Sequence, residues 1–81
     1  MFIGKVVGSV VSTRKNEKLI GSKFMIVEMA DGMGEAKKLV AVDNVGAGIG
    51  ETVLVARGSA ARIGCGLENA PVDAAIVGIV D

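Results

Sequence analysis

The sequence predicts a mainly β fold: a small, closed or nearly closed five-stranded barrel with one short helix between the fourth and fifth strands. Three observations support this prediction. Valine and isoleucine are concentrated in five runs of strand length, as expected for β-strands. Glycine-rich or charged segments separate these runs and are typical of turns. Only the segment directly after the fourth run favours a helix. The combination is typical of OB-like barrels.

The predicted strands are Phe2–Val11, Leu19–Met29, Ala36–Asp43, Glu51–Arg57 and Val72–Val80. In the first strand Gly4 and Gly8 are four residues apart, so we expect them to share one face of the sheet. In the second strand Gly21 is a possible bulge site. The pair Asp31-Gly32, which is common in hairpin turns, is expected to connect the second and third strands.

A glycine-dense turn, Gly46-Ala47-Gly48-Ile49-Gly50, precedes the fourth strand. Gly46 and Gly48 fit the start of a dinucleotide-binding fingerprint, but its third glycine position is Glu51, and a β-branched run follows where a helix is needed. We therefore interpret the turn as a link between strands. Its glycines Gly46, Gly48 and Gly50 are expected to allow positive φ or close backbone approach. Asp43 is expected to make hydrogen bonds in the turn, and Glu51 to be solvated or to lie between subunits.

Ser59 is predicted to be the N-cap of a short helix over Ala60–Ile63, with a weak anion site at that helix end as the alternative. The last strand is apolar on both predicted faces, which are Ala74, Ile76, Gly78 and Val80 on one side and Ala75, Val77 and Ile79 on the other. Such a strand must be covered twice, here by the barrel core and by another subunit. Ile76 and Val77 are therefore expected to divide core from interface, with Glu51 and Arg62 setting register at the other side of the contact.

Composition indicates one domain over residues 1–81 with little scope for catalysis. A chain of 81 residues gains only marginal stability from its own core. It has one cysteine, Cys65, and no histidine, which excludes an internal disulfide and disfavours a zinc site. The missing histidine also removes the usual general base, so we predict a protein that is not an enzyme and needs no cofactor or metal. Because hydrophobic residues make up 51% of the chain, oligomerisation is the expected source of further stability.

Charge is unevenly placed although the formal net charge is zero. Residues 1–23 carry Lys5, Arg14, Lys15, Lys18 and Lys23 against Glu17 alone. This basic segment and the barrel class leave an OB-like nucleic-acid-binding module as the alternative function. Such modules stack bases on aromatic residues, and the chain has only Phe2 and Phe24. No apolar run is long enough for a membrane span, and Lys5 comes too early for a signal peptide, so we expect a cytoplasmic protein.

Several segments resemble the ethanolamine-utilisation N and carboxysome L family of bacterial microcompartment vertex proteins. They are Gly4–Lys15, Leu19–Phe24, Val42–Leu54, Arg57–Arg62 and Pro71–Asp81. The glycine turn combined with Gly58-Ser59-Ala60-Ala61-Arg62 is the most specific part of the match. The resemblance implies a five-stranded barrel that assembles as a cyclic pentamer and caps the vertices of polyhedral shells tiled mainly by hexameric shell proteins. It implies no catalysis and no obligatory cofactor. From the composition we expect neither nucleic acid nor membrane as a partner.

Overall fold

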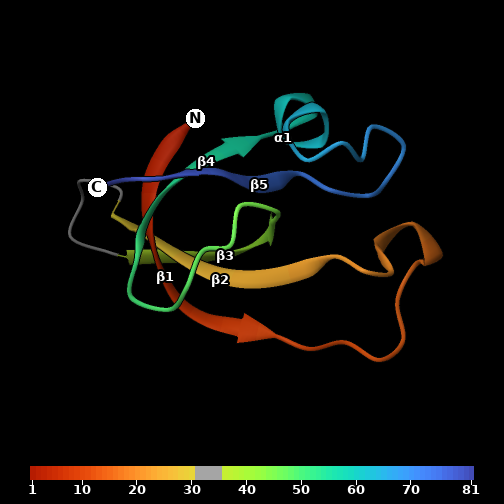
Figure 1. Cartoon of the computed structure of the whole chain (residues 1–81), viewed down its shortest axis with the longest axis horizontal. Helices are drawn as coiled ribbons and strands as arrows, with labels where there is room; N and C mark the ends of the chain where they lie inside the picture. Colours follow the sequence, from red (N-terminus) through yellow and green to blue (C-terminus); the bar gives the residue numbers. More distant parts are fainter. Residues whose placement is uncertain (31–35) are drawn as a thin grey trace.

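The computed structural model is a closed barrel of five strands with a short helix packed on its outside (Figure 1). It describes residues 1–30 and 36–81, so the predicted Asp31-Gly32 turn lies outside the described residues. The elements are β1 (Phe2–Val10), the 3-10 helix η1 (Glu17–Leu19), β2 (Lys23–Ala30), β3 (Ala36–Asp43), β4 (Thr52–Arg57), α1 (Ser59–Gly64) and β5 (Ala74–Ile79). The predicted fold class, with its helix between the fourth and fifth strands, is confirmed.

The strands close in the order β1-β2-β3-β5-β4. Neighbouring strands are antiparallel except β3 and β5, which run parallel and pair only at Val42 with Ala75 and Asp43 with Ile76. β1 is shared between two partners, since its first half pairs with β4 and its second half with β2. This long strand therefore joins the two halves of the barrel, as its curved path in Figure 1 shows.

The barrel interior is filled by small and medium-sized apolar side chains: Val6, Met25, Val27, Ala41, Ala47, Val53, Val55, Ala74 and Ile76. Phe2 and Leu39 pack against this cluster while remaining partly exposed. A narrow five-stranded barrel leaves little room inside. At Gly4 a Cβ would lie 2.5 Å from Cγ1 of Val27, so the absence of a side chain there lets β1 pass close to β2.

A second apolar cluster lies outside the barrel, beneath α1 and the segment that follows it. It comprises Val42, Ala56, Ala61, Ala70, Val72 and Ala75, with Val77 packed against it. The prediction that another subunit covers the second face of β5 is therefore wrong for Ala75 and Val77. Instead, α1 covers this face of β5. The side chain of Ala61 is small, so the helix can pack closely against the strand.

Two register shifts change which residues face outward. One lies between Val6 and Gly8 of β1, and the other leaves Val77 of β5 without a partner opposite β4. Each extra residue displaces the inside–outside alternation by one position. Gly4 pairs with the buried Val53, whereas Gly8 pairs with the outward-facing Ile26. The predictions that Gly4 and Gly8 share a face, and that β5 alternates regularly to its end, are therefore wrong.

The start of β2 also differs from the prediction. Glu17–Leu19 forms one turn of 3-10 helix, in which the side chain of Asn16 accepts a hydrogen bond from the backbone N–H of Lys18. Gly21 lies in the turn that follows, before β2 begins at Lys23. The predicted bulge at Gly21 is therefore wrong, because that residue precedes the sheet.

Candidate functional site

The glycine turn between β3 and β4 is held by the carboxylate of Asp43. One oxygen accepts a hydrogen bond from the backbone N–H of Val45 at 3.0 Å, and the other accepts one from Ala47 at 2.9 Å. The Asp43 side chain is almost fully buried, and Lys23 Nζ lies 3.7 Å from its Oδ2. Lys23 also donates a hydrogen bond to the carbonyl of Ala47 at 3.4 Å. The predicted turn role of Asp43 is confirmed.

Glu51 closes the other end of the turn. Its Oε1 accepts a hydrogen bond from the backbone N–H of Gly48 at 2.7 Å, and Gly50 donates to the carbonyl of Val6 at 2.8 Å. The backbone N–H groups of Gly48 and Gly50, like those of Val45 and Ala47, are thus bonded within the chain. In a phosphate-binding loop such groups would be free to bind the phosphate. This arrangement excludes the dinucleotide-binding interpretation.

Positive φ occurs at two of the three predicted glycines, at Gly46 (φ 86°) and Gly50 (φ 94°), but not at Gly48. At Gly48 a Cβ would approach only the flexible Oε1 of Glu51, at 3.3 Å. The expected positive φ is therefore confirmed at Gly46 and Gly50, whereas Gly48 has neither a positive φ nor a close backbone neighbour.

Ser59 is the first residue of α1 and not its N-cap. The capping position is taken by Gly58 (φ 65°), and no side-chain hydrogen bond caps the helix. Gly58 instead donates its N–H to the carbonyl of Asp73 at 2.9 Å. This backbone hydrogen bond to the residue before β5 holds the start of α1, and the Ser59 hydroxyl does not cap the helix.

Arg62 lies half-buried on α1 and donates from Nη1 to the carbonyl of Val72 at 3.1 Å. It ties the helix to the segment before β5, and its predicted role between subunits stays a prediction. Cys65 follows the helix and packs half-buried against the second cluster. Ile76 is fully buried inside the barrel, so it belongs to the core, while Val77 lies half-buried near the end of α1.

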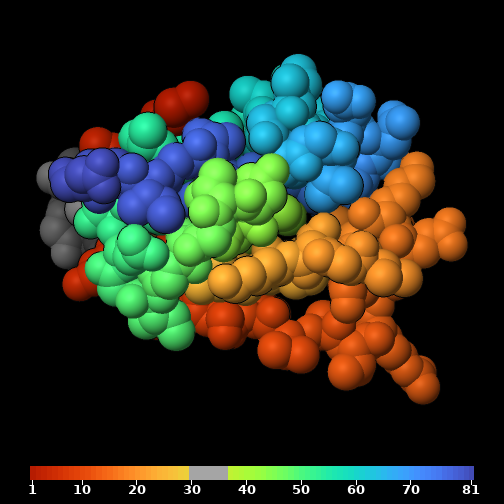
Figure 2. Space-filling model, viewed as in Figure 1, coloured from red at the N-terminus to blue at the C-terminus, as the bar shows by residue number. Residues whose placement is uncertain are grey.

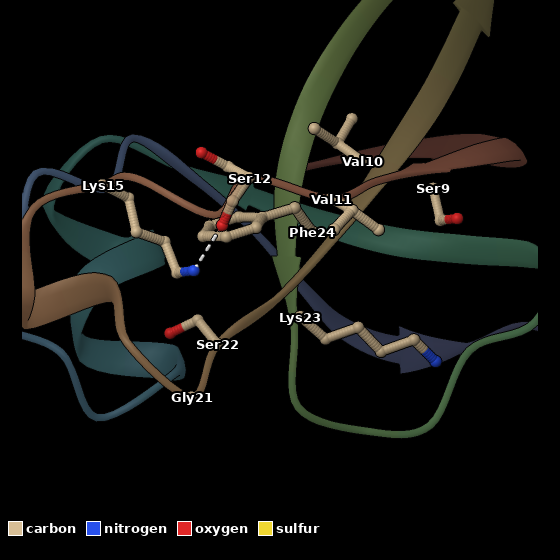
Figure 3. A pocket seen from close by; sticks show the side chains of 9 residues that line it. All are labelled: Ser9, Val10, Val11, Ser12, Lys15, Gly21, Ser22, Lys23 and Phe24. Atoms are coloured by element: carbon tan, nitrogen blue, oxygen red, sulfur yellow. Dashed lines mark hydrogen bonds between the residues drawn. The ribbon is translucent and has the colours of Figure 1, made fainter.

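One open pocket of about 380 Å³ lies between the end of β1 and the start of β2 (Figure 3), lined by Ser9, Val10, Val11, Ser12, Lys15, Gly21, Ser22, Lys23 and Phe24. Its polar groups do not converge on one point. The ammonium of Lys15 donates to the carbonyl of Ser12 at 2.6 Å, and Lys23 points away from Lys15 (Figure 3), toward Ala47. The pocket therefore lacks the arrangement that holds a small charged ligand.

The two aromatic residues do not form a surface for stacking bases. Phe2 packs against the barrel core with the guanidinium of Arg57 at 5.9 Å from its ring centre. Phe24 packs against the second cluster, on the outside of β2. Both are half-buried, and they belong to different clusters, which disfavours the nucleic-acid-binding alternative.

Apolar side chains on the outer surface are the feature that sequence reasoning did not locate. Large exposed examples are Met1, Ile3, Val7, Val11, Ile20, Val40, Val45, Ile49, Ile63, Ile79 and Val80. Strand alternation could have identified Ile3 and Val40, because both flanking residues of each point into the barrel in a regular strand.

The basic segment near residues 12–18 stands out from the barrel (Figure 2).

Across the described residues, 1–30 and 36–81, no three cysteine or acidic side chains are grouped closely enough to hold a metal ion. In the same ranges no helix has the length and apolar character needed to cross a membrane.

Comparison with known proteins gives a match over the whole chain. The family model for ethanolamine utilisation protein EutN/carboxysome matches residues 1–81. The microcompartment shell vertex protein GrpN of Rhodospirillum rubrum is 48% identical over 83 aligned residues, which cover 100% of this chain and 93% of GrpN. The structure of CcmL from Nostoc sp. PCC 7120 superposes with a TM-score of 0.89 at 51% identity, over 100% of this chain and 89% of that one. The structure of GrpN, described as a pentameric microcompartment shell protein, gives a TM-score of 0.81 at 47% identity, over 100% and 93% of the two chains.

Proposed function

The chain belongs to the EutN/carboxysome family, and we propose that it is a structural shell protein that forms cyclic pentamers and caps the vertices of a bacterial microcompartment in the cytoplasm. Relatives that align with all of this chain are named as shell vertex proteins of carboxysomes and of other microcompartments. One of them is described as pentameric in its solved structure. The likeness in fold and sequence extends over the whole barrel, which supports the same kind of assembly here.

The apolar outer surface is the observation that carries this proposal. Ile3 is 59% exposed and Val40 is 49% exposed, although both lie in paired strands. An outward strand position in an antiparallel sheet is normally polar when it meets water. Exposed apolar patches with a polar rim mark association sites. A ring of copies buries it, whereas a monomer leaves it in water.

A structural role also agrees with how the ionisable groups are used. The buried carboxylate of Asp43 accepts hydrogen bonds from backbone N–H groups and forms an ion pair with Lys23. Glu51 is bonded to the same turn. These groups hold the fold, and none is left in the geometry of a nucleophile with its base. We therefore propose that the protein has no catalytic activity of its own.

Hexameric shell proteins are the proposed neighbours of the ring. A flat layer of hexamers needs five-fold units in order to curve and close, so a vertex pentamer must contact hexamers on every side. The basic segment around residues 12–18, which stands out from the barrel (Figure 2), suits an acidic edge on such a neighbour.

Co-expression with the hexameric shell proteins of the same microcompartment tests this function. Electron microscopy is expected to show closed polyhedral shells when the chain is present, and open sheets, tubes or uncapped shells when it is omitted. The Cys65→Ser variant serves as a control, because a half-buried cysteine without a base or a disulfide partner should be dispensable. Shells that close equally well without the chain would contradict the vertex role. A monomer whose affinity for single-stranded DNA falls with salt would instead support the nucleic-acid alternative.

A further inference from the structure

An apolar row crosses the outside of the barrel over β4. Ile3 of β1 pairs with Leu54 of β4, which in turn pairs with Gly78 of β5. Both residues that flank Leu54 along its strand, Val53 and Val55, are fully buried inside the barrel, so Leu54 and its partners face outward. We call Ile3, Leu54 and Gly78 the β4 stripe.

A second apolar row has the same design and lies over β2. Gly8 of β1 pairs with Ile26 of β2, which pairs with Val40 of β3. The neighbours of Ile26 in its strand, Met25 and Val27, are buried in the core. We call Gly8, Ile26 and Val40 the β2 stripe; the β2 segment runs across the viewed face in Figure 2.

Each stripe has a raised end and a low end. Ile3 and Val40 are the exposed ends of the two stripes. Gly78 and Gly8 are the low ends, over which Leu54 and Ile26 lie, since a Cβ at either glycine would be 3.4 Å from the Cδ1 of its neighbour. This difference in height allows the exposed side chain at one end of a stripe to pack over the glycine at the end of another stripe. Interfaces require such shape complementarity.

Both stripes are bounded in the same way. On one side lies a row already covered by the second cluster, with Ala56 and Ala75 beside the β4 stripe and Phe24 and Val42 beside the β2 stripe. On the other side lies a polar row formed by Lys5 with its partners Thr52, Glu28 and, next along, Lys38. Each stripe is thus an uncovered apolar strip with a polar rim, the anatomy of an interface core.

The geometry points to these stripes as the two contact faces of the ring: we propose that the β4 stripe of one copy packs on the β2 stripe of the next. This inference rests on the proposed pentamer. A cyclic ring repeats one heterologous contact, so it needs two unlike faces on each copy. The strand order places β1 between β2 and β4, so one stripe runs from β1 over β4 to β5 and the other from β1 over β2 to β3.

A second copy of the chain is the proposed occupant, because a solved relative is described as pentameric and a closed ring requires each face of one copy to meet a face of the next. Within the strand bounds, β2 and β3 carry Lys23, Lys37 and Lys38 against Glu28 and the buried Asp43, and β4 and β5 carry Arg57. Because both sides carry the same net charge, the apolar side chains of the stripes and not charge attraction carry the contact.

Two single variants test the heterologous contact. Ile3→Glu places a charge on the β4 stripe alone, and Val40→Glu does so on the β2 stripe alone; burying an unpaired charge disfavours association. Each variant by itself should be a folded monomer in native mass spectrometry. A mixture of the two should give a one-to-one heterodimer, because the Val40→Glu variant keeps an intact β4 stripe and the Ile3→Glu variant keeps an intact β2 stripe.

Ile20→Glu is the matched control. Ile20 is 71% exposed in the turn before β2 and lies outside both stripes, so this variant should keep the oligomeric state of the unaltered chain. Circular dichroism establishes that each variant is folded. Thiol labelling gives a second reading on the intact ring: in a Cys65→Ser background, the thiols of Ile3→Cys and Val40→Cys should react at least about tenfold more slowly than that of Ile20→Cys, because an interface core excludes water.

The outcomes separate this inference from the function on which it rests. If the unaltered chain is a monomer, the ring itself is contradicted. If it is a pentamer and Ile3→Glu and Val40→Glu remain pentamers, or if their thiol counterparts label as fast as the control, the ring stands and the stripes are not its contact faces. Folded monomeric variants that form no heterodimer on mixing would contradict the pairing of unlike stripes.

Discussion

Asp43 shows how one buried side chain determines the shape of a turn that a glycine pattern alone leaves open. Its carboxylate binds two N–H groups of the turn and lies beside Lys23. A polar group with so little exposure is stabilising only because its hydrogen bonds are satisfied. The turn then returns the chain to β1 through the bond from Gly50 to Val6.

Removing that carboxylate should destabilise the fold. Asp43→Ala leaves the N–H groups of Val45 and Ala47 without their acceptors, and the expected loss in the free energy of unfolding is about 2 kcal/mol. Urea denaturation at one fixed protein concentration measures it, since association also adds stability. Asp73→Ala, at an exposed carboxylate, is the control and should change little. Equal effects of the two substitutions would refute the role assigned to Asp43.

The glycines of the turn should differ in their tolerance of a side chain. Gly50→Ala forces a Cβ into the positive-φ region and should cost about 1–2 kcal/mol. Gly48→Ala has no such backbone requirement and meets only the end of the Glu51 side chain, so its cost should be clearly smaller. Thermal or urea unfolding of the pair compares them directly. A greater loss at Gly48 than at Gly50 would contradict this assignment.

At the scale of elements, alternation of apolar residues was enough to predict five strands and the position of the helix, but not the register of the barrel. The extra residues Val7 and Val77 are valines among other apolar residues. The residues on both faces of the strand are apolar there, so the sequence pattern looks the same with or without the register shift. The start of β2 was missed because Leu19 and Ile20 look like strand residues, whereas Asn16 initiates a turn of 3-10 helix.

The covering of β5 was also beyond sequence reasoning. A strand that is apolar on both faces indicates two covers, but it does not say which cover is a subunit and which is the same chain. Ala61 and Ala70 bring α1 and the following segment onto the strand. The candidate interface then moves from the outer face of β5 to the stripes over β2 and β4, where Ile3 and Val40 remain uncovered.

The contact between α1 and β5 should show as a coupling between two residues. At Gly64 a Cβ would lie 2.9 Å from Cγ1 of Val77, so Gly64→Ala crowds that valine, which opposes the gain in helix propensity from alanine. Val77→Ala removes the crowded methyl groups. In a double-mutant cycle measured by urea unfolding, the two substitutions should be coupled by about 1 kcal/mol, with Gly64→Ala better tolerated beside Val77→Ala. Additive effects would indicate that the helix does not pack tightly there.

At the scale of the whole molecule, ring formation accounts for a composition that a small monomer does not need. Large aliphatic side chains remain on the outside although the barrel interior and the second cluster are already filled. A core of this size supplies only marginal stability, and association adds to it in a concentration-dependent way. The division between a basic first third and an acidic remainder also suits a head-to-tail contact.

Native mass spectrometry of the purified, unaltered chain decides whether the barrel forms a ring. We expect one dominant species with the mass of a pentamer, the state described for the GrpN structure, which dissociates on dilution without unfolding of the barrel. A monomer at every concentration, or a dimer with two equivalent faces, would contradict the claim that this barrel closes into a ring.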